Sequence, residues 1–242
     1  MSKIICLWAS PRNISTAMMY SFAQREEVAV VDEPFYAYYL NNVNPKSLHP
    51  GKKEILKNQS SNFNMVLQEL NELYTKELIF IKNMTHHLNG QKVDFAKNWS
   101  NVILTRSPKR SIASFSRVIK NPTLQDLGYK SQYELAKEFK KNKIKFYLIE
   151  AEDLLINPEK HLKKICDFCN LKFSKEMLSW PKGGIIEDGV WAKYWYKNVH
   201  NSTGFKESNS HEEIQLPVKY NSLYKEASFY YDALKNLIKI KC

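Results

Sequence analysis

The stretch from residue 3 to residue 17 reads KIICLWASPRNISTA, and its two halves differ in character. Residues 3–8 are nearly all apolar and rich in isoleucine and leucine, which predicts a short β-strand. Residues 9–13 contain serine, proline and asparagine and are typical of a turn, and a helical pattern follows from Ser15 to about Gln24. The sequence therefore predicts a strand, a loop and a helix in immediate succession.

Four further apolar runs share this setting, each with polar flanks and helical sequence after it. They are residues 28–31, 78–81, 102–104 and 146–149. Unbroken rather than alternating apolarity indicates strands that are buried on both faces. We therefore predict an α/β fold of three layers, with a central parallel sheet flanked by helices and a ligand site beyond the carboxyl ends of the strands.

Chain length and net charge limit the number of domains and the kinds of partner that this protein could have. A chain of 242 residues suits one sizeable core, so we expect residues 1–242 to form a single domain. No apolar run is long enough to span a membrane and the N-terminal run is too short for a signal peptide, which favours a cytoplasmic location. A net charge of +11 suits a polyanionic partner or a solvated basic surface. Without a zinc-finger spacing or an RNA-binding aromatic signature, a multiply phosphorylated small ligand is favoured over nucleic acid.

Three regions outside the strand pattern give weaker predictions. Residues 41–61 are polar and weakly patterned, as in a loop or lid, and residues 179–215 are irregular but aromatic. Residues 223–240 predict a C-terminal helix. Cys166 and Cys169 form a lone C-x-x-C without a second ligand pair, so buried thiols are expected there and no metal.

The loop after the first strand suits an anion. The first backbone N–H groups of a helix lack intrahelical partners and lie at the positive end of its dipole, and Arg12, Ser15 and Thr16 add charged or hydroxyl donors. The Walker pattern G-x-x-x-x-G-K-[ST] is absent, which argues against an ordinary ATPase. The alternative to an anion site is a purely structural role, in which Ser15 caps the helix and Arg12 is a charge on the protein surface.

A second segment, LTRSPKRSIAS at residues 104–114, again follows a strand and opens a helix. Arg106 and Ser114 lie eight residues apart and can meet over one site, because the turn folds the helix back past the strand end. A surface ion pair and a helix with scattered serines would explain the same residues.

A third segment, EAEDLLINPEKHLKKICDF at residues 150–168, completes a series. In this order, the three segments resemble the nucleotide-binding and structural elements of the sulfotransferase family, over a span from residue 8 to about residue 170. The resemblance implies a P-loop-type fold and a domain that binds 3′-phosphoadenosine-5′-phosphosulfate (PAPS). It also implies transfer of a sulfuryl group from PAPS to a hydroxyl or amine of a small acceptor, without a metal.

The resemblance assigns roles by position. Arg12 stands where many members carry a lysine that contacts the transferring group, and Arg106 and Ser114 stand where members bind the 3′-phosphate. The loop that wraps the 5′-phosphosulfate corresponds to Asn13, Ile14, Ser15, Thr16 and Ala17.

Two departures from the family pattern concern the donor site. Many members have glycine at the position of Ile14, and a β-branched residue favours negative φ. Either the loop backbone is expected to differ there or the donor is expected to sit differently. The late R-K-G stretch of the family is also missing. Ser202, Thr203 and Gly204 occupy a similar place and are expected to contact the donor.

The base that takes the acceptor's proton has two candidates. Glu33 follows the second strand in an E-P pair that resembles some bacterial members, and its carboxyl would need partial burial to raise its pKa. His86 follows the third strand, close after Lys82, and its ordinary pKa suits proton transfer. Each residue also has an alternative role without catalysis. Glu33 could cap a helix or form an ion pair, and His86 could pack in the core.

Two other functions fit parts of the pattern. A P-loop kinase of a small molecule would share the fold, with Asp32 assisting a magnesium ion, although the Walker lysine and serine are missing. A nucleotide-binding protein that no longer performs transfer would explain Ile14 and the missing late motif. The aromatic stretches at residues 35–39 and 191–196 could line an acceptor pocket, but they do not identify an acceptor or an oligomeric state.

Overall fold

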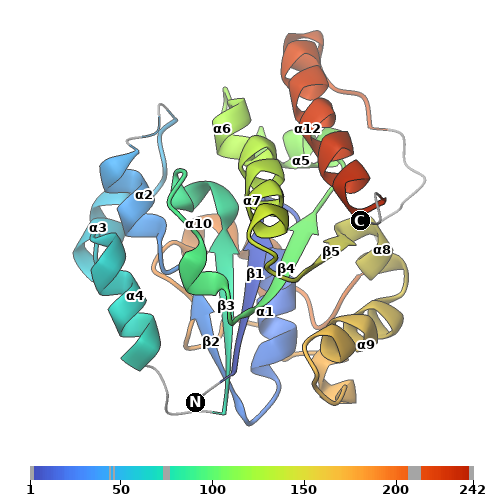
Figure 1. Cartoon of the computed structure of the whole chain (residues 1–242). Helices are drawn as coiled ribbons and strands as arrows, with labels where there is room; N and C mark the ends of the chain where they lie inside the picture. Colours follow the sequence, from blue (N-terminus) through green and yellow to red (C-terminus); the bar gives the residue numbers. More distant parts are fainter. Residues whose placement is uncertain (1–2, 44, 46, 73–76, 207–213, 240–242) are drawn as a thin grey trace.

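The computed structural model describes residues 3–43, 45, 47–72, 77–206 and 214–239. Five strands form one sheet with the order β2-β3-β1-β4-β5, and every neighbouring pair is parallel (Figure 1). The strands are β1 Lys3–Ala9, β2 Val28–Asp32, β3 Leu78–Met84, β4 Ser100–Thr105 and β5 Phe146–Glu150. All five predicted strands are therefore confirmed.

Helices cover both faces of this sheet. On one face, Ile5 and Leu7 of β1 belong to a core that includes α1 (Ser15–Ala23), α8 (Ala151–Ile156) and α9 (Pro158–Phe168). On the other face, alternate residues of β1 pack with α4 (Phe63–Glu72) and α7 (Tyr129–Lys141). Because β1 is central and buried on both sides, its apolarity is continuous, and the predicted three-layer α/β fold is confirmed.

The remaining helices lie around this framework (Figure 1). The α-helices are α2 Tyr36–Asn42, α3 Lys52–Asn58, α5 Pro108–Phe115, α6 Leu124–Leu127, α10 Ala192–Trp195, α11 Lys197–His200 and α12 Asn221–Lys239. The 3₁₀ helices are Thr85–Leu88, Asp94–Ala96, Lys175–Leu178 and Val218–Tyr220. Among the described residues, no helix has both the length and the apolarity that crossing a membrane requires.

Local sequence explains how α9 begins. The side chain of Asn157 accepts a hydrogen bond from the backbone N–H of Lys160 at 3.0 Å, and Pro158 occupies the first turn. An asparagine cap followed by proline is a strong signal for a helix start. The asparagine side chain satisfies a free backbone N–H, and proline has no N–H that would need a partner. The Asn-Pro step of the third segment thus marks the start of a helix.

The prediction of a loop at residues 41–61 is wrong in part. Residues 41 and 42 end α2, and residues 52–58 form α3, while residues 44 and 46 lie outside the described part of the chain. Within α3, only Ile55 is buried, so the helix carries almost no apolar pattern that a sequence could reveal. Residues 179–206 are irregular apart from the two short helices α10 and α11, as the sequence predicts.

Candidate functional site

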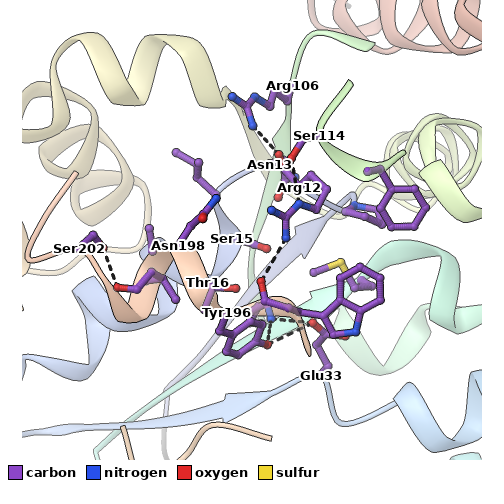
Figure 2. A pocket seen from close by; sticks show the side chains of 18 of the residues that line it. Arg12, Asn13, Ser15, Thr16, Glu33, Arg106, Ser114, Tyr196, Asn198 and Ser202 are labelled. Carbon is purple, nitrogen blue, oxygen red and sulfur yellow. Dashed lines mark hydrogen bonds and ion pairs between the residues drawn. The ribbon is translucent and has the colours of Figure 1, made fainter. Parts of the chain in front are cut away.

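A cavity of about 600 Å³ lies at the carboxyl ends of the strands. Its wall comes from the loops after β1, β2, β3 and β4 and from the late segment at residues 195–206 (Figure 2). Of the residues predicted for the site, it includes Arg12, Asn13, Ile14, Ser15, Thr16, Ala17, Glu33, His86, Arg106, Ser114, Ser202 and Gly204. Thr203 is not among the lining residues; its carbonyl accepts a hydrogen bond from the backbone N–H of Trp180 at 3.2 Å.

The backbone of the loop after β1 overturns the expectation for Ile14. Ile14 has a φ of 64° and lies in the left-handed region, as does Arg12, with the same φ. A left-handed conformation costs a β-branched residue about 1–3 kcal/mol, so the surrounding contacts must hold it there. One such contact is the buried side chain of Asn13, which donates hydrogen bonds to the Leu104 carbonyl and the Ser10 hydroxyl.

This backbone leaves the first turn of α1 without a side-chain cap. Ile14 is the N-cap residue and makes no capping bond, so Ser15 is not the cap but the first helical residue. Ser15, Thr16 and Ala17 line the cavity at this end of the helix. Free N–H groups of a first helical turn attract anions, and the positive helix end adds to that attraction. The loop therefore has the chemistry of an anion site.

Arg12 and Arg106 share the cavity and are joined directly. Arg106 Nη1 donates to the carbonyl oxygen of Arg12 at 2.6 Å, and Arg12 Nε donates to Ser114 Oγ at 3.0 Å (Figure 2). Arg12 Nη1 also donates to the carbonyl of Trp195 at 3.2 Å. Arg106 and Ser114 thus meet at one site, as predicted, with Arg12 between them.

The positive charges of Arg12 and Arg106 at this end of the cavity are only partly balanced by acidic side chains of the described residues. Burial lowers the pKa of Arg12, and the neighbouring positive charges of Arg106 and Arg117 lower it further. Arg106 has one acidic neighbour, Glu152, whose Oε1 lies 3.6 Å from Arg106 Nε. Two arginines in a partly buried site favour an anion, because each positive charge is costly to bury without a counter-charge.

A buried polar cluster forms the other end of the cavity. Lys82 is fully buried, and its Nζ lies 2.6 Å from Glu33 Oε1 and 2.8 Å from Asp32 Oδ1. Lys82 also donates to the hydroxyl of Tyr196 (Figure 2). This hydroxyl donates in turn to Asp32 Oδ2 at 2.7 Å. Trp191 Nε1 donates to the same hydroxyl at 2.9 Å. We call Asp32, Glu33, Lys82 and Tyr196 the carboxylate cluster.

The protonation of this cluster follows from burial and charge. Burial raises the pKa of Glu33, the positive charge of Lys82 opposes that rise, and the charge of Asp32 adds to it. For Lys82, burial alone would lower the pKa, but the two carboxylates outweigh burial and raise it. The cluster therefore holds a charged lysine beside a carboxyl group whose pKa lies above its ordinary range.

His86 stands close to two other histidines. Burial lowers the pKa of His86 to about 3 and that of His49 to about 4, and it holds the pKa of His87 well below the ordinary value. All three side chains are less than 10% exposed and line the cavity. At neutral pH, they are therefore uncharged imidazoles.

Sequence reasoning missed part of the wall. Lys82 lies near the end of β3 and His87 directly follows His86, so the signal for both was present in the same stretch of sequence. Tyr196 lies in the aromatic stretch that the sequence offered as pocket lining, although without a polar role. His49 belongs to the segment interpreted as a loop or lid, and no motif there marks it.

The comparisons with known proteins agree with this geometry. The family model described as "Sulfotransferase domain" matches residues 2–238, so the chain belongs to the sulfotransferase domain family. Two plant proteins, the branched-chain-amino-acid aminotransferase-like proteins 1 and 2 of Arabidopsis thaliana, are 31% and 29% identical to it. The matches cover 98% and 99% of this chain but 42% of each relative, so the chain spans less than half the length of these curated relatives.

Solved structures share the fold at low sequence identity. The sulfotransferase domain from the curacin biosynthetic pathway has a TM-score of 0.63 at 18% identity, over 96% of this chain and 98% of that one. The sulfotransferase domain from the Synechococcus PCC 7002 olefin synthase has a TM-score of 0.58 at 16% identity, over 96% and 95%. Mouse sulfotransferase SULT7A1, solved in complex with PAP, has a TM-score of 0.50 at 13% identity, over 93% and 83%.

Proposed function

We propose that this chain transfers a sulfuryl group from PAPS to a hydroxyl or amine of a small acceptor. The observation that carries the proposal is the placing of Arg12 and Arg106 in one cavity, joined by a hydrogen bond of 2.6 Å, at the free end of α1. Two cationic groups and a helix N-terminus suit a small ligand with more than one phosphate-like group. Membership of the sulfotransferase domain family supports the same reading.

The donor would lie along the loop after β1. In this proposal, the backbone of residues 13–17 holds the 5′-phosphosulfate at the N-terminus of α1, and Arg12 stabilises the charge on the transferring group. Arg106 and Ser114 hold the 3′-phosphate. Ser202 and Gly204 line the cavity and would contact the donor, whereas Thr203 is assigned to anchoring through its hydrogen bond from Trp180.

Glu33 is the better candidate for the base. Its carboxyl lines the cavity, and burial raises its pKa, which makes it a stronger base than an ordinary carboxylate. His86 has a pKa of about 3, which makes its neutral imidazole a weak base. In the proposed step, an acceptor hydroxyl gives its proton to Glu33 while its oxygen bonds to sulfur. The bond from sulfur to the 5′-phosphate oxygen breaks and adenosine 3′,5′-bisphosphate (PAP) leaves.

Binding of PAP tests the donor site without knowledge of the acceptor. We expect PAP to raise the melting temperature of the protein, and Arg106→Ala to weaken PAP binding by about 1.5–3 kcal/mol, the cost of losing a charge-assisted contact. Isothermal titration calorimetry measures the change. Lys163→Ala is the matched control, because it removes one positive charge from an exposed position in α9 outside the cavity.

Two results would contradict the proposal. One is a wild-type protein whose melting temperature does not move at millimolar PAP, and the other is equal affinity for PAP in Arg106→Ala and Lys163→Ala. Magnesium-dependent turnover of ATP would instead favour the kinase hypothesis.

A further inference from the structure

The carboxylate cluster is built from parts of the chain that are far apart in sequence. Asp32 ends β2, and Lys82 lies opposite it in the register of β3, so the sheet itself fixes this pair. Glu33 follows Asp32 directly and has a φ of 41°. Tyr196 comes from the late segment, more than 100 residues after Lys82, and its hydroxyl is buried among the other three side chains.

The hydroxyl of Tyr196 has all its hydrogen-bonding capacity in use. It accepts from Lys82 and from Trp191 Nε1. Its one proton has its shortest contact with Asp32 Oδ2, at 2.7 Å, whereas Glu33 Oε1 lies farther away, at 3.4 Å. Asp32 Oδ2 receives a further bond from the backbone N–H of Gly189 at 3.1 Å. The late segment therefore satisfies Asp32, which otherwise competes with Glu33 for the ammonium of Lys82.

We propose that Tyr196 is a positioning residue for Glu33 and acts through the ammonium of Lys82 and the carboxylate of Asp32. This inference rests on the proposed function, in which Glu33 is the base. One ammonium serves two carboxylates, so any donor that Asp32 receives from elsewhere leaves more of Lys82 for Glu33. Tyr196 supplies such a donor and also holds Lys82 from a third side.

The surroundings of Glu33 allow the direction of change to be derived. Besides Asp32, Lys82 and Tyr196, the titratable groups that face it in the described part of the chain are Tyr36 of α2 and His87, whose Nδ1 lies 4.0 Å from Glu33 Oε2. His87 is neutral near pH 7, and burial beside Glu33 raises the pKa of Tyr36, so neither carries charge. Burial raises the pKa of Glu33, and its charged neighbours Lys82 and Asp32 act on it in opposite directions, with a smaller lowering from the Tyr196 hydroxyl at 3.4 Å. Changes in how Lys82 is shared with Asp32 should therefore shift this pKa.

Two substitutions are expected to move the Glu33 carboxyl in opposite directions. Tyr196→Phe removes the donor to Asp32, draws Lys82 toward Asp32 and raises the pKa of Glu33. Asp32→Asn removes the competing negative charge, leaves Lys82 to Glu33 and lowers the pKa of Glu33. Each shift should be about one pH unit, which corresponds to one charge-assisted hydrogen bond.

Carbon-detected NMR titration measures these shifts without an acceptor. The protein is labelled with ¹³C at the glutamate side-chain carboxyl, and the Glu33 signal is assigned by its loss in Glu33→Gln. Shifts of opposite sign support the inference. An unchanged Glu33 titration in both variants, or shifts of the same sign, overturns it, because a structural role for Tyr196 alone predicts no such pair.

The same samples separate this inference from the proposed function. Binding of PAP is measured on each protein, so a wild type that fails to bind PAP would overturn the proposed function while the titration still reports on Tyr196. If Tyr196→Phe does not fold, Trp191→Phe replaces it, since it removes a donor to the Tyr196 hydroxyl and should raise the pKa of Glu33 by a smaller amount. An unchanged or lowered Glu33 pKa in Trp191→Phe would then overturn the inference.

Discussion

The loop after β1 shows how a single residue can break a local rule. Ile14 takes a left-handed conformation that glycine would adopt more easily, and Arg12 does the same. The reason is tertiary: Arg106 holds the carbonyl of Arg12, and Asn13 is bonded to the Leu104 carbonyl. No pattern within the loop records these bonds, so the sequence could place the anion loop but not its backbone.

Backbone strain at Ile14 predicts that a glycine variant is more stable than an alanine variant at this position, the reverse of the usual order in a helix. Ile14→Gly and Ile14→Ala both remove the side chain, but only glycine relieves the positive φ. We expect Ile14→Gly to have a free energy of unfolding about 1 kcal/mol higher than that of Ile14→Ala, as measured by urea denaturation.

The ordinary order of glycine and alanine serves as the control. At Ala17, within α1, Ala17→Gly should lower the free energy of unfolding by about 1 kcal/mol. Equal stability of the two Ile14 variants, or a more stable alanine variant, would contradict a strained loop.

At the scale of elements, the long helix α12 packs against α7, and it also contacts α5 (Figure 1). Ala227 and Leu234 are its fully buried apolar residues, whereas Phe229 is 66% exposed. Leu234 joins the core on the α7 side of the sheet, together with Leu135 and Phe139. The helix therefore contributes to stability through one face, and Leu234 on that face is not among the residues that line the cavity.

This packing predicts that substitutions at different positions of α12 lower the free energy of unfolding by different amounts. Leu234→Ala should lower the free energy of unfolding by about 2–4 kcal/mol, because it leaves a cavity in the core. Phe229→Ala should cost less than about 0.5 kcal/mol, since surface substitutions change little. Urea denaturation measures both, and PAP affinity should be the same in the two variants. A similar loss of stability for both would show that α12 does not pack through the Leu234 face.

The elements that sequence analysis found and missed differ in how they bury apolar surface. The inner strands β1, β3 and β4 are buried almost throughout, so continuous apolar runs mark them. The edge strands β2 and β5 are only partly buried, yet their sequences are also continuously apolar and marked them equally well. The helix α3 buries only Ile55, and its remaining contacts to α2 depend on a polar, weakly patterned stretch. A helix that rests on a single buried side chain gives no periodic signal, so it was predicted as loop.

Across the whole molecule, three buried neutral histidines make stability depend on acid. The unfolded chain binds protons at these residues below about pH 6.5, whereas the folded pKa values are about 4 for His49 and about 3 for His86. Since the unfolded state binds more protons in that interval, the free energy of unfolding falls as pH drops from about 6.5 toward 4. The contribution is fully present above pH 6.5.

A matched variant isolates one of these histidines. His86→Gln should reduce the slope of unfolding free energy against pH by about 1.4 kcal/mol per pH unit between pH 6 and pH 4, which corresponds to one proton. Urea denaturation at several pH values gives the slope for both proteins. Identical slopes would mean that His86 is protonated in the folded state.

The sequence could predict those site residues whose positions are determined by the sheet. Arg12, Glu33, His86 and Arg106 each follow a different strand, and parallel strands bring their carboxyl ends to one edge. The late segment was not predictable in this way, because no strand carries it. Its position depends on bonds such as that between Tyr196 and Asp32, which join residues 164 positions apart.

The late segment has one further property, which follows from its covalent structure. The carbonyl of Trp195 that receives Arg12 and the Cα that bears the phenol of Tyr196 belong to one planar peptide unit. An anion that binds Arg12 therefore acts one peptide unit away from the hydroxyl that donates to Asp32. Two neighbouring residues of the late segment thus link the arginine end of the cavity to the carboxylate cluster.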